Sequence, residues 1–494
     1  MPLTANTTTI KVSPTSLNPT YNETIVVLES TNVAQENFQW VIEIWVDGLP
    51  NGLNTTLIST LVILPNPEGF GVIDVQRHVE NYITTTFQPA DLDTIGTAED
   101  SYRIWSLNVT EYFDNYVWTF DRHNTSGGKI VFINDTEDHF FEVGDEVNIA
   151  QTPVPTYPAY DGETTVFAIT SPDSITIDKA GTTVLNEPGV ATGNKTVEIS
   201  QTTASSFLYK SFNGVIDFAD FNSFNLSLYD MDASNPTALF LTDIPNNYEL
   251  SRTDPLWING YSESLSFITM NIITDNGDFL INPISPTPPI NDTNIIQSKI
   301  GYTDLLNSTS TITVNSGSLP MVDPSTTFIT AQAMQGVTAI GEVKSFTVVD
   351  KCSKYENIKL FFLDRLGSYI PLNFDRVNRT NVTNERSNYK QNYGNYDSVA
   401  NAWGYTTHAR GTTTYDIKST KSITCTSDWL NDEQVELMHI LLTSPDVYYI
   451  DEAGVYRAVT ITTNSFEEKK RVNDKLLNYT ITFEYANNNG NQRG

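Results

Sequence analysis

The feature that most constrains this chain is a period-two alternation of apolar and polar residues that recurs along its length. Residues 38–48, FQWVIEIWVDG, place four apolar side chains on one face: Trp40, Ile42, Ile44 and Val46. Successive side chains of a strand point to opposite faces, so this alternation is typical of a half-buried strand. Residues 101–113 repeat it, and long runs of Ala, Glu, Lys and Leu are absent. The sequence therefore predicts a mainly β protein with a few short helices.

The spacing of the strand patterns predicts several domains, because 494 residues exceed what one hydrophobic core usually holds. A polar, glycine-rich stretch at 122–128, RHNTSGG, marks one boundary. Short, closely spaced strand patterns after it are typical of a small β-barrel. We expect four domains: a sandwich-like 1–122, an inserted barrel 123–195, a sandwich-like 196–340 that contains a proline-rich linker at Ile281–Asp292, and a β-rich 341–494.

Two helices and one polar arm complete this expectation. Residues 432–442, DEQVELMHILL, predict a helix capped by Asn431 or Asp432. A shorter helix is predicted at Asp74–Ile83, with Asp74 as its cap. Residues 373–401 are rich in Asn and Tyr and poor in apolar residues, which predicts a long arm or loop.

The charge balance disfavours a dedicated nucleic-acid binder. Lys and Arg number 28 against 59 Asp and Glu, a formal net charge of −31, so the surface repels phosphate backbones. Two cysteines form neither a disulfide framework nor a zinc site. No signal peptide and no run of about 20 apolar residues is present. We expect a soluble protein that is made in a reducing cytosol and does not enter a membrane.

The sequence contains no pattern that predicts catalysis, a metal site or a cofactor. The stretch Asp230–Asn235 begins like a calcium loop, but Asn235 stands where that loop requires Gly. None of the five histidines has a metal-ligand spacing, and His439 is interpreted as a packed helix residue. Cys425 with His408 or His439 lacks any local nucleophile signature. We therefore expect no enzyme activity and no cofactor.

The stretch 359–376, KLFFLDRLGSYIPLNFDR, interrupts an apolar strand with Asp364, Arg365 and Gly367. A catalytic Asp/Arg pair is one interpretation, and a charged glycine turn at a strand end is the favoured one. Because Arg and Tyr are enriched at protein interfaces, the turn and the arm supply candidate subunit contacts. These candidates are Arg365, Gly367, Tyr369, Tyr389, Tyr393 and Tyr396.

Both ends of the chain resemble a known family. The N-terminal part contains an Asn-Pro-x-Tyr opening at 18–21, a Pro-Asn-Pro-x-Gly-x-Gly segment at 65–71, Asp74, and Asn-Tyr at 81–82. The C-terminal part contains LFFLDRLGSYIPLNF, SPDVYYI at 444–450 and a closing NYTITFEYAN. These motifs resemble virion structural proteins of tailed phages of Bacteroidetes, of the crAss-like type. The family's W-L-N-R-x-G-G pattern is matched only in part, and the barrel region at 142–161 resembles insertions of related proteins.

The resemblance implies a ring, adaptor or collar component of a virion tail, synthesised in the host bacterial cytoplasm. Such a protein would assemble as a cyclic homo-oligomer, contact neighbouring tail or portal proteins, and let genomic DNA pass through an acidic conduit. One alternative is a receptor- or carbohydrate-binding adhesin or baseplate protein, with Trp40, Trp45, Trp257 and Trp403 as stacking candidates. Another is a glycan hydrolase with scattered carboxylates.

Overall fold

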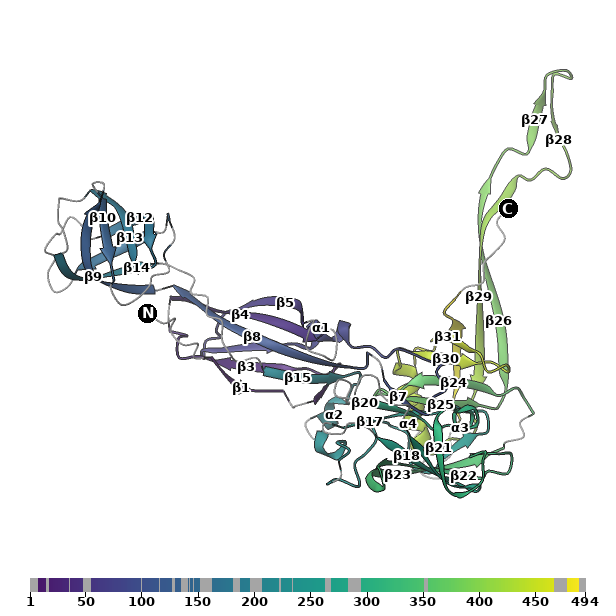
Figure 1. Cartoon of the computed structure of the whole chain (residues 1–494). Coiled ribbons are helices and arrows are strands. Elements are labelled where there is room, and N and C mark those ends of the chain that lie inside the picture. The colour runs from purple at the N-terminus through teal and green to yellow at the C-terminus, as the bar shows by residue number, and fades with distance from the viewer. Residues whose placement is uncertain are drawn as a thin grey trace. The chain divides into compact units, whose positions relative to one another are not determined.

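The computed structural model divides the chain into two compact units, both dominated by strands (Figure 1). Unit 1 comprises Met1–Ile83 and Arg103–Phe212, and unit 2 comprises Thr84–Tyr102 and Asn213–Gly494. The structure describes residues 8–14, 17–34, 36–47, 55–98, 100–114, 116–126, 129–134, 141, 143–144, 146–151, 162–180, 187–195, 207–221, 224–232, 234–262, 268–282, 295–350, 354–465 and 478–487. The predicted mainly-β class with few short helices is confirmed.

Unit 1 contains two open sheets that share one apolar core. The five-stranded sheet has the order β2 (Leu17–Pro19), β15 (Phe207–Phe212), β8 (Tyr102–Asp114), β4 (Glu36–Asp47), β5 (Thr55–Ile63). The three-stranded sheet has the order β1 (Thr9–Val12), β3 (Ile25–Glu29), β6 (Phe70–Asp74). The apolar face expected for β4 is buried: Trp40, Ile42 and Ile44 are 0% exposed. They pack with Leu28 and Leu107 from both sheets, as in a sandwich.

Unit 1 also contains the closed barrel. Its strands follow the order β10 (Lys129–Ile133), β13 (Ser174–Ala180), β12 (Gly162–Ser171), β11 (Glu146–Gln151), β14 (Glu187–Lys195), β9 (Tyr116–Ser126). The predicted boundary at residue 122 is wrong, because it falls inside β9. Residues 122–126 are polar but extended, and each is paired with β10, from Arg122↔Ile133 to Ser126↔Lys129. Closure around the barrel therefore keeps a polar segment in a strand.

The predicted helix near Asp74 is shorter than expected. Asp74 ends β6, and its carboxylate accepts hydrogen bonds from the Thr24 and Gln76 backbone N–H groups, both at 3.1 Å. The helical residues are α1 (Gln76–Val79) and the 3₁₀ turn η1 (Glu80–Tyr82).

The described part of unit 2 contains a six-stranded sheet, a ten-stranded sheet and a two-stranded sheet that is described below. The first has the order β16 (Tyr248–Ser251), β23 (Thr338–Val349), β22 (Phe328–Gln335), β18 (Thr269–Thr274), β19 (Gly277–Asn282), β21 (Thr311–Gly317). The second has the order β26 (Asn378–Lys390), β29 (Thr412–Thr426), β32 (Thr480–Tyr485), β31 (Tyr456–Ile461), β30 (Val447–Ile450), β24 (Ile358–Leu363), β25 (Tyr369–Phe374), β17 (Trp257–Tyr261), β20 (Ile295–Lys299), β7 (Ile95–Thr97).

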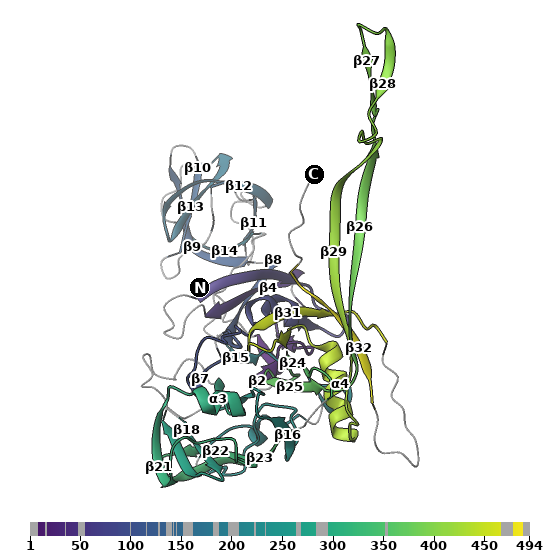
Figure 2. The same ribbon diagram turned by 90° about the vertical axis from the view of Figure 1, so that its right-hand side faces the viewer.

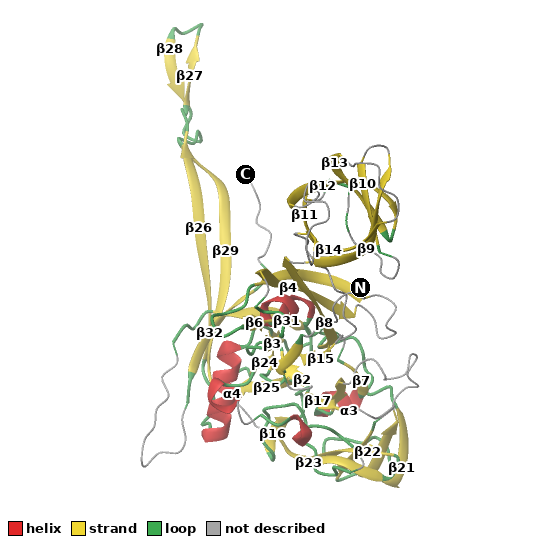
Figure 3. Ribbon diagram, turned by 90° about the vertical axis from the view of Figure 1, so that its left-hand side faces the viewer, coloured by secondary structure: helices red, strands yellow, loops and turns green. Residues whose placement is uncertain are grey.

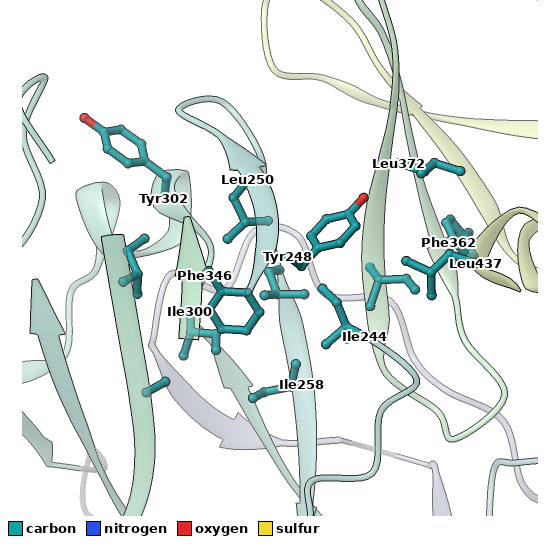
Figure 4. Packing of buried hydrophobic residues seen from close by; sticks show 14 of the residues in the cluster. Ile244, Tyr248, Leu250, Ile258, Ile300, Tyr302, Phe346, Phe362, Leu372 and Leu437 are labelled. Atoms are coloured by element: carbon teal, nitrogen blue, oxygen red, sulfur yellow. The ribbon is translucent and has the colours of Figure 1, made fainter. Parts of the chain in front are cut away.

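One core runs through both sheets of unit 2, so the predicted boundary at residue 340 is also wrong. It falls inside β23, whose Phe346 packs in the same cluster as Tyr248, Phe362 and Leu437 (Figure 4). The proline-rich stretch lies outside the described residues, apart from Ile281 and Asn282 at the end of β19.

The helices of unit 2 are short (Figure 3). Those in the described residues are α2 (Phe218–Phe221), η3 (Leu226–Leu228), α3 (Tyr302–Asn307) and α4 (Asp432–Thr443). The last covers the helix predicted at 432–442. Its cap is Asn431: the Asn431 side chain accepts from the Gln434 N–H at 2.8 Å, and the Gln434 side chain accepts from the Asn431 N–H at 3.2 Å. No helix in the described part of the chain is long and apolar enough to cross a membrane.

Candidate functional site

The turn between β24 and β25 is organised around the buried carboxylate of Asp364. Its oxygens accept hydrogen bonds from the backbone N–H groups of Asp243, Leu366 and Ser368 at 2.8 to 3.0 Å, and from the Thr242 hydroxyl at 2.9 Å. Burial raises the pKa of Asp364 to about 7, and the neighbouring Asp243 carboxylate adds to the rise. With both oxygens occupied, the carboxylate holds the turn to residues 242–243.

Gly367 is required by the backbone of this turn. Its φ of 89° lies in the left-handed region, and an added Cβ would come within 2.6 Å of the Asn213 carbonyl oxygen. Gly367 is buried, which corrects its predicted role as a subunit contact.

Arg365 makes its ion pairs within the same chain. Its guanidinium lies 3.0 Å from Asp243 and 3.2 Å from Glu436 on α4. The side chain is 26% exposed, so the pairs are partly shielded from water. The prediction of a free, exposed Arg365 at a subunit contact is corrected: the side chain ties the turn to two other segments of unit 2.

Tyr369 is buried in an aromatic cluster. It is 0% exposed, and its ring centroid lies 5.2 to 5.6 Å from those of Phe87, Phe361 and Trp257. It is therefore no surface contact, contrary to the prediction. Because β24 and β25 are central strands of the ten-stranded sheet, both of their faces are covered, and the alternation that would expose Tyr369 is lost.

A long hairpin, residues 378–426, projects from the ten-stranded sheet and is called the arm below (Figures 1 and 2). Its strands β26 and β29 are paired from Asn378↔Cys425 to Lys390↔Thr412. Only the last five residues of β29, Ser422–Thr426, pair with β32. From Lys421 to the tip, the arm therefore has no further neighbouring strand among the described strands. Every side chain of β26 after Asn378 is exposed. At roughly 3.3 Å per residue, β26 alone spans about 40 Å.

This geometry revises the arm predicted at 373–401. Residues 369–374 belong to β25, and the arm extends to residue 426 as a paired ladder rather than a loop. Three predicted contact residues lie on the arm and are exposed: Tyr389, Tyr393 and Tyr396.

The far end of the arm is a second two-stranded ladder with a defined aromatic arrangement. Strands β27 (Gly394–Asp397) and β28 (Ala402–Tyr405) pair Tyr396 opposite Trp403. The indole of Trp403 lies against Gly394, where an added Cβ would come within 2.2 Å of Nε1. Trp403 is nevertheless 59% exposed. The tip therefore presents an ordered aromatic surface to its surroundings.

The arm carries the opposite charge balance from the rest of the chain. It contains six Lys and Arg and three Asp and Glu, whereas the remainder contains 22 and 56. None of Arg386, Lys390, Arg410 and Lys418 forms an ion pair with a residue that the structure describes. The arm is thus a locally basic, aromatic surface on a strongly acidic protein.

A cleft of about 420 Å³ lies at the root of the arm, between residues 245–251, the end of β25 and the start of α4. Its lining includes four carboxylate residues and no Lys or Arg: Glu249, Asp375, Asp428 and Glu433. It also includes Trp429, which is 54% exposed. The cleft could not be predicted from the sequence, because its walls come from separate segments, including residues 245–251, 372–375 and 428–434. The available signal was Trp429, two residues before the Asn431 cap of α4.

Other candidate residues are packed or separated. Cys425 is 0% exposed, and burial strongly raises the pKa of its thiol. His439 is exposed on α4, which corrects its interpretation as a packed residue. Trp40 and Trp257, proposed for sugar stacking, are at most 2% exposed. Within the described ranges, no group of three or more His, Cys, Asp and Glu side chains could hold a metal ion.

Comparison with known proteins adds little. No family model matches the chain, and no curated protein sequence matches it. Among solved structures, one described as a phage phi92 endosialidase aligns with 99% of this chain and 70% of its own, at 9% identity and a TM-score of 0.16. A TM-score this low carries no argument about fold or function.

Proposed function

We propose that this chain is a structural component of a bacteriophage virion tail: a ring, adaptor or collar protein that assembles into a cyclic homo-oligomer. The observation that carries the proposal is the arm. A two-stranded ribbon is marginally stable in water by itself, and its exposed Tyr, Trp and Arg side chains are the types enriched at protein interfaces. The resemblance of both chain ends to virion proteins of crAss-like Bacteroidetes phages supplies the setting.

In this proposal the protein acts by assembly, without a cofactor and without catalytic turnover. Its partners are further copies of itself and neighbouring tail or portal proteins, and it does not enter a membrane. Genomic DNA passes the assembled ring, whose acidic surface would limit sticking during ejection.

The test compares the full chain with an arm-truncated variant in which Asn-Gly replaces residues 384–419. This joins the paired residues Thr383 and Thr420 through a two-residue hairpin turn. We expect the full chain to form a ring of fixed copy number by mass photometry, and the truncated chain to stay monomeric with an unchanged melting temperature. A full chain that remains monomeric at high concentration, together with virion reconstructions without ring density that fits it, would overturn the proposal.

A second candidate function, a glycan-binding adhesin, is favoured by two exposed tryptophans, Trp403 on the arm and Trp429 at the cleft. Exposed aromatic rings can stack on sugar rings. Glycan-array binding that is lost in W403A or W429A would support this function. Turnover of a polysaccharide by the purified chain would instead support the hydrolase.

A further inference from the structure

The charge separation between the arm and the cleft indicates what the arm binds. The arm presents cations that have no partner among the described residues, and the cleft presents carboxylates beside an exposed tryptophan. Clusters of opposite charge flanked by aromatic residues are a common pattern of complementary protein surfaces. The basic arm and the acidic cleft are therefore complementary in charge, and the cleft is a candidate acceptor site for an arm.

A second hollow at the arm root, also lined by described residues, matches the arm less well. It has a volume of about 720 Å³ and is lined on the other side by β31 and β32. Its lining includes Lys421 and Arg457, and Arg457 lies 2.9 Å from Asp451, which is also in the lining. A surface that already contains cations and an internal ion pair has less attraction for a basic arm. The acidic cleft also contains one ion pair, between Asp428 and Arg376 at 2.6 Å, but its lining has no Lys or Arg and includes three further carboxylate residues, so it is the better acceptor.

A copy cannot place its own arm in its own cleft. Asp375 precedes β26 by a few residues, and Asp428 and Trp429 follow β29 directly, so the cleft lies where the arm begins. Arg386 and Lys390 lie eight and twelve residues after Asn378, the first residue of β26, which corresponds to roughly 25 and 40 Å of strand. Because β26 is hydrogen-bonded to β29 over this length, the ladder holds these cations away from the cleft (Figure 2).

We infer, on the basis of the proposed ring function, that the arm of one copy docks in the acidic cleft of the next copy. Each copy then uses one surface as donor and a different one as acceptor. Such a heterologous contact closes into a ring when the rotation between copies divides a full turn. The contact pairs Arg386, Lys390 or Arg410 with Glu249 and Glu433, and brings the aromatic arm toward Trp429.

Nucleic acid is the competing partner for a basic, aromatic ribbon. An excess of only three positive charges, on a chain whose remainder contains 56 carboxylates, gives weak and strongly salt-dependent attraction to a phosphate backbone. The cleft of a second copy supplies carboxylates that attract the arm at close range, whereas a phosphate backbone is repelled by the carboxylates of the rest of the chain. The observations therefore favour the neighbouring copy.

The first experiment is a charge swap in the full chain. R386E/K390E changes the formal charge of the arm from +3 to −1, and E249K/E433K changes that of the four lining carboxylate positions from −4 to 0. We expect each double variant to weaken self-association at least about 10-fold by analytical ultracentrifugation. Their combination in one chain should restore much of the loss, because the attraction is reinstated with opposite signs. R77E/K354E changes exposed cations outside the arm by the same total charge and should leave association within about twofold.

The second experiment maps the contact by disulfide capture. N388C, between Arg386 and Lys390 on the arm, and Q434C, beside Glu433 in the cleft lining, are prepared as separate variants, each with Cys352→Ser, and mixed under mild oxidation. We expect a covalent N388C–Q434C heterodimer in excess over either homodimer, because the docking brings these two positions together. Native Cys425 is buried and serves as an unreactive internal reference.

The outcomes separate this inference from the proposed function. If wild-type chains form rings while R386E/K390E assembles normally and no heterodimer is captured, the docking inference is wrong and the ring function stands. If the wild-type chain does not assemble at all, both fail. If R386E/K390E assembles normally but loses binding to a 30-base single-stranded DNA in a mobility-shift assay, the arm binds nucleic acid and the inference is overturned.

Discussion

Asp364 shows that a residue's type and its sequence neighbours do not determine which distant residues its side chain contacts. The sequence indicated a charged turn followed by glycine, and the structure has that turn. The side chains' partners were unpredictable from the sequence, because Thr242 and Asp243 are more than 120 residues away along the chain. Arg365 and Tyr369 also have partners far away along the chain, Asp243 and Phe87 among them, so two candidate contacts turned out to be packing residues.

At the residue scale, we expect Asp364→Asn to destabilise unit 2 strongly. At pH 8 the carboxylate is ionised and accepts four hydrogen bonds, whereas an amide group turns one of its two ends into a donor that faces other donors. The free energy of unfolding, measured by urea titration, should fall by about 2 kcal/mol or more. The matched control is Asp217→Asn, an exposed turn carboxylate, which should change it by less than about 0.5 kcal/mol. Equal effects would contradict the structural role of Asp364.

Asp304 gives stability an unusual pH dependence. Burial raises its pKa from 3.8 to about 6, despite hydrogen bonds from the Leu256 and Gly301 N–H groups. The folded chain therefore binds this proton more tightly than the unfolded chain. Stability from this group is present at pH 4 and is lost as pH rises through 6, a decline of up to about 3 kcal/mol.

Urea titrations between pH 4.5 and 7.5 test this expectation. Asp304→Asn should reduce the decline in the free energy of unfolding, because its side chain does not titrate, and the part due to Asp364, whose pKa is raised to about 7, should remain. Asp451→Asn is the control: hydrogen bonds lower the pKa of Asp451, so its contribution changes below pH 4 and the measured slope should be unaffected. An identical slope in wild type and Asp304→Asn would be the contrary result.

At the level of elements, local signals predicted what local forces determine. The helix α4 follows from its own capping residues and apolar positions, and β4 from its alternation. The arm was predicted only as a polar arm or loop, because β26 has no buried face and Val382 is its single aliphatic residue. A strand that buries nothing shows no period-two pattern, although its backbone is fully paired to β29.

The arm tip offers a prediction about one element. Gly394→Ala places a Cβ where the Trp403 indole lies, so the indole must move, whereas Gly404→Ala meets no atom within 4 Å. We expect Gly394→Ala to shift the Trp403 signal in the ¹⁹F spectrum of 5-fluorotryptophan-labelled protein, with the signal identified through Trp403→Phe. It should also weaken self-association about fivefold, which is about 1 kcal/mol. Matching spectra for the two alanine variants would show that the tip is not ordered as described.

At the scale of the whole molecule, composition and alternation predicted the mainly-β class because many strands with a buried face contribute to that signal. They could not predict the division into two units, because it depends on contacts between distant segments. Residues 95–97 form β7, which pairs with β20 two hundred residues later and so belongs to unit 2. The two mistaken boundaries at 122 and 340 have the same cause, since paired strands cross both.

Net charge leads to a prediction about the assembled molecule. Copies with a formal charge of −31 repel one another, but at 0.1 M salt this repulsion is screened beyond roughly 10 Å. The remaining salt-sensitive term is the short-range attraction between the basic arm and the acidic cleft. Raising NaCl from 0.1 to 0.5 M should therefore weaken wild-type self-association by about 10-fold in analytical ultracentrifugation.

The R386E/K390E variant decides whether that salt dependence comes from the arm. Reversing these charges replaces an attraction with a repulsion, and salt screens the repulsion instead. Its weaker self-association should stay constant or strengthen over the same range of NaCl, so the two salt dependences have opposite signs. The R77E/K354E control should follow the wild type. If all three proteins respond to salt alike, the attraction between copies arises elsewhere on the surface, and the arm contributes through its aromatic side chains alone.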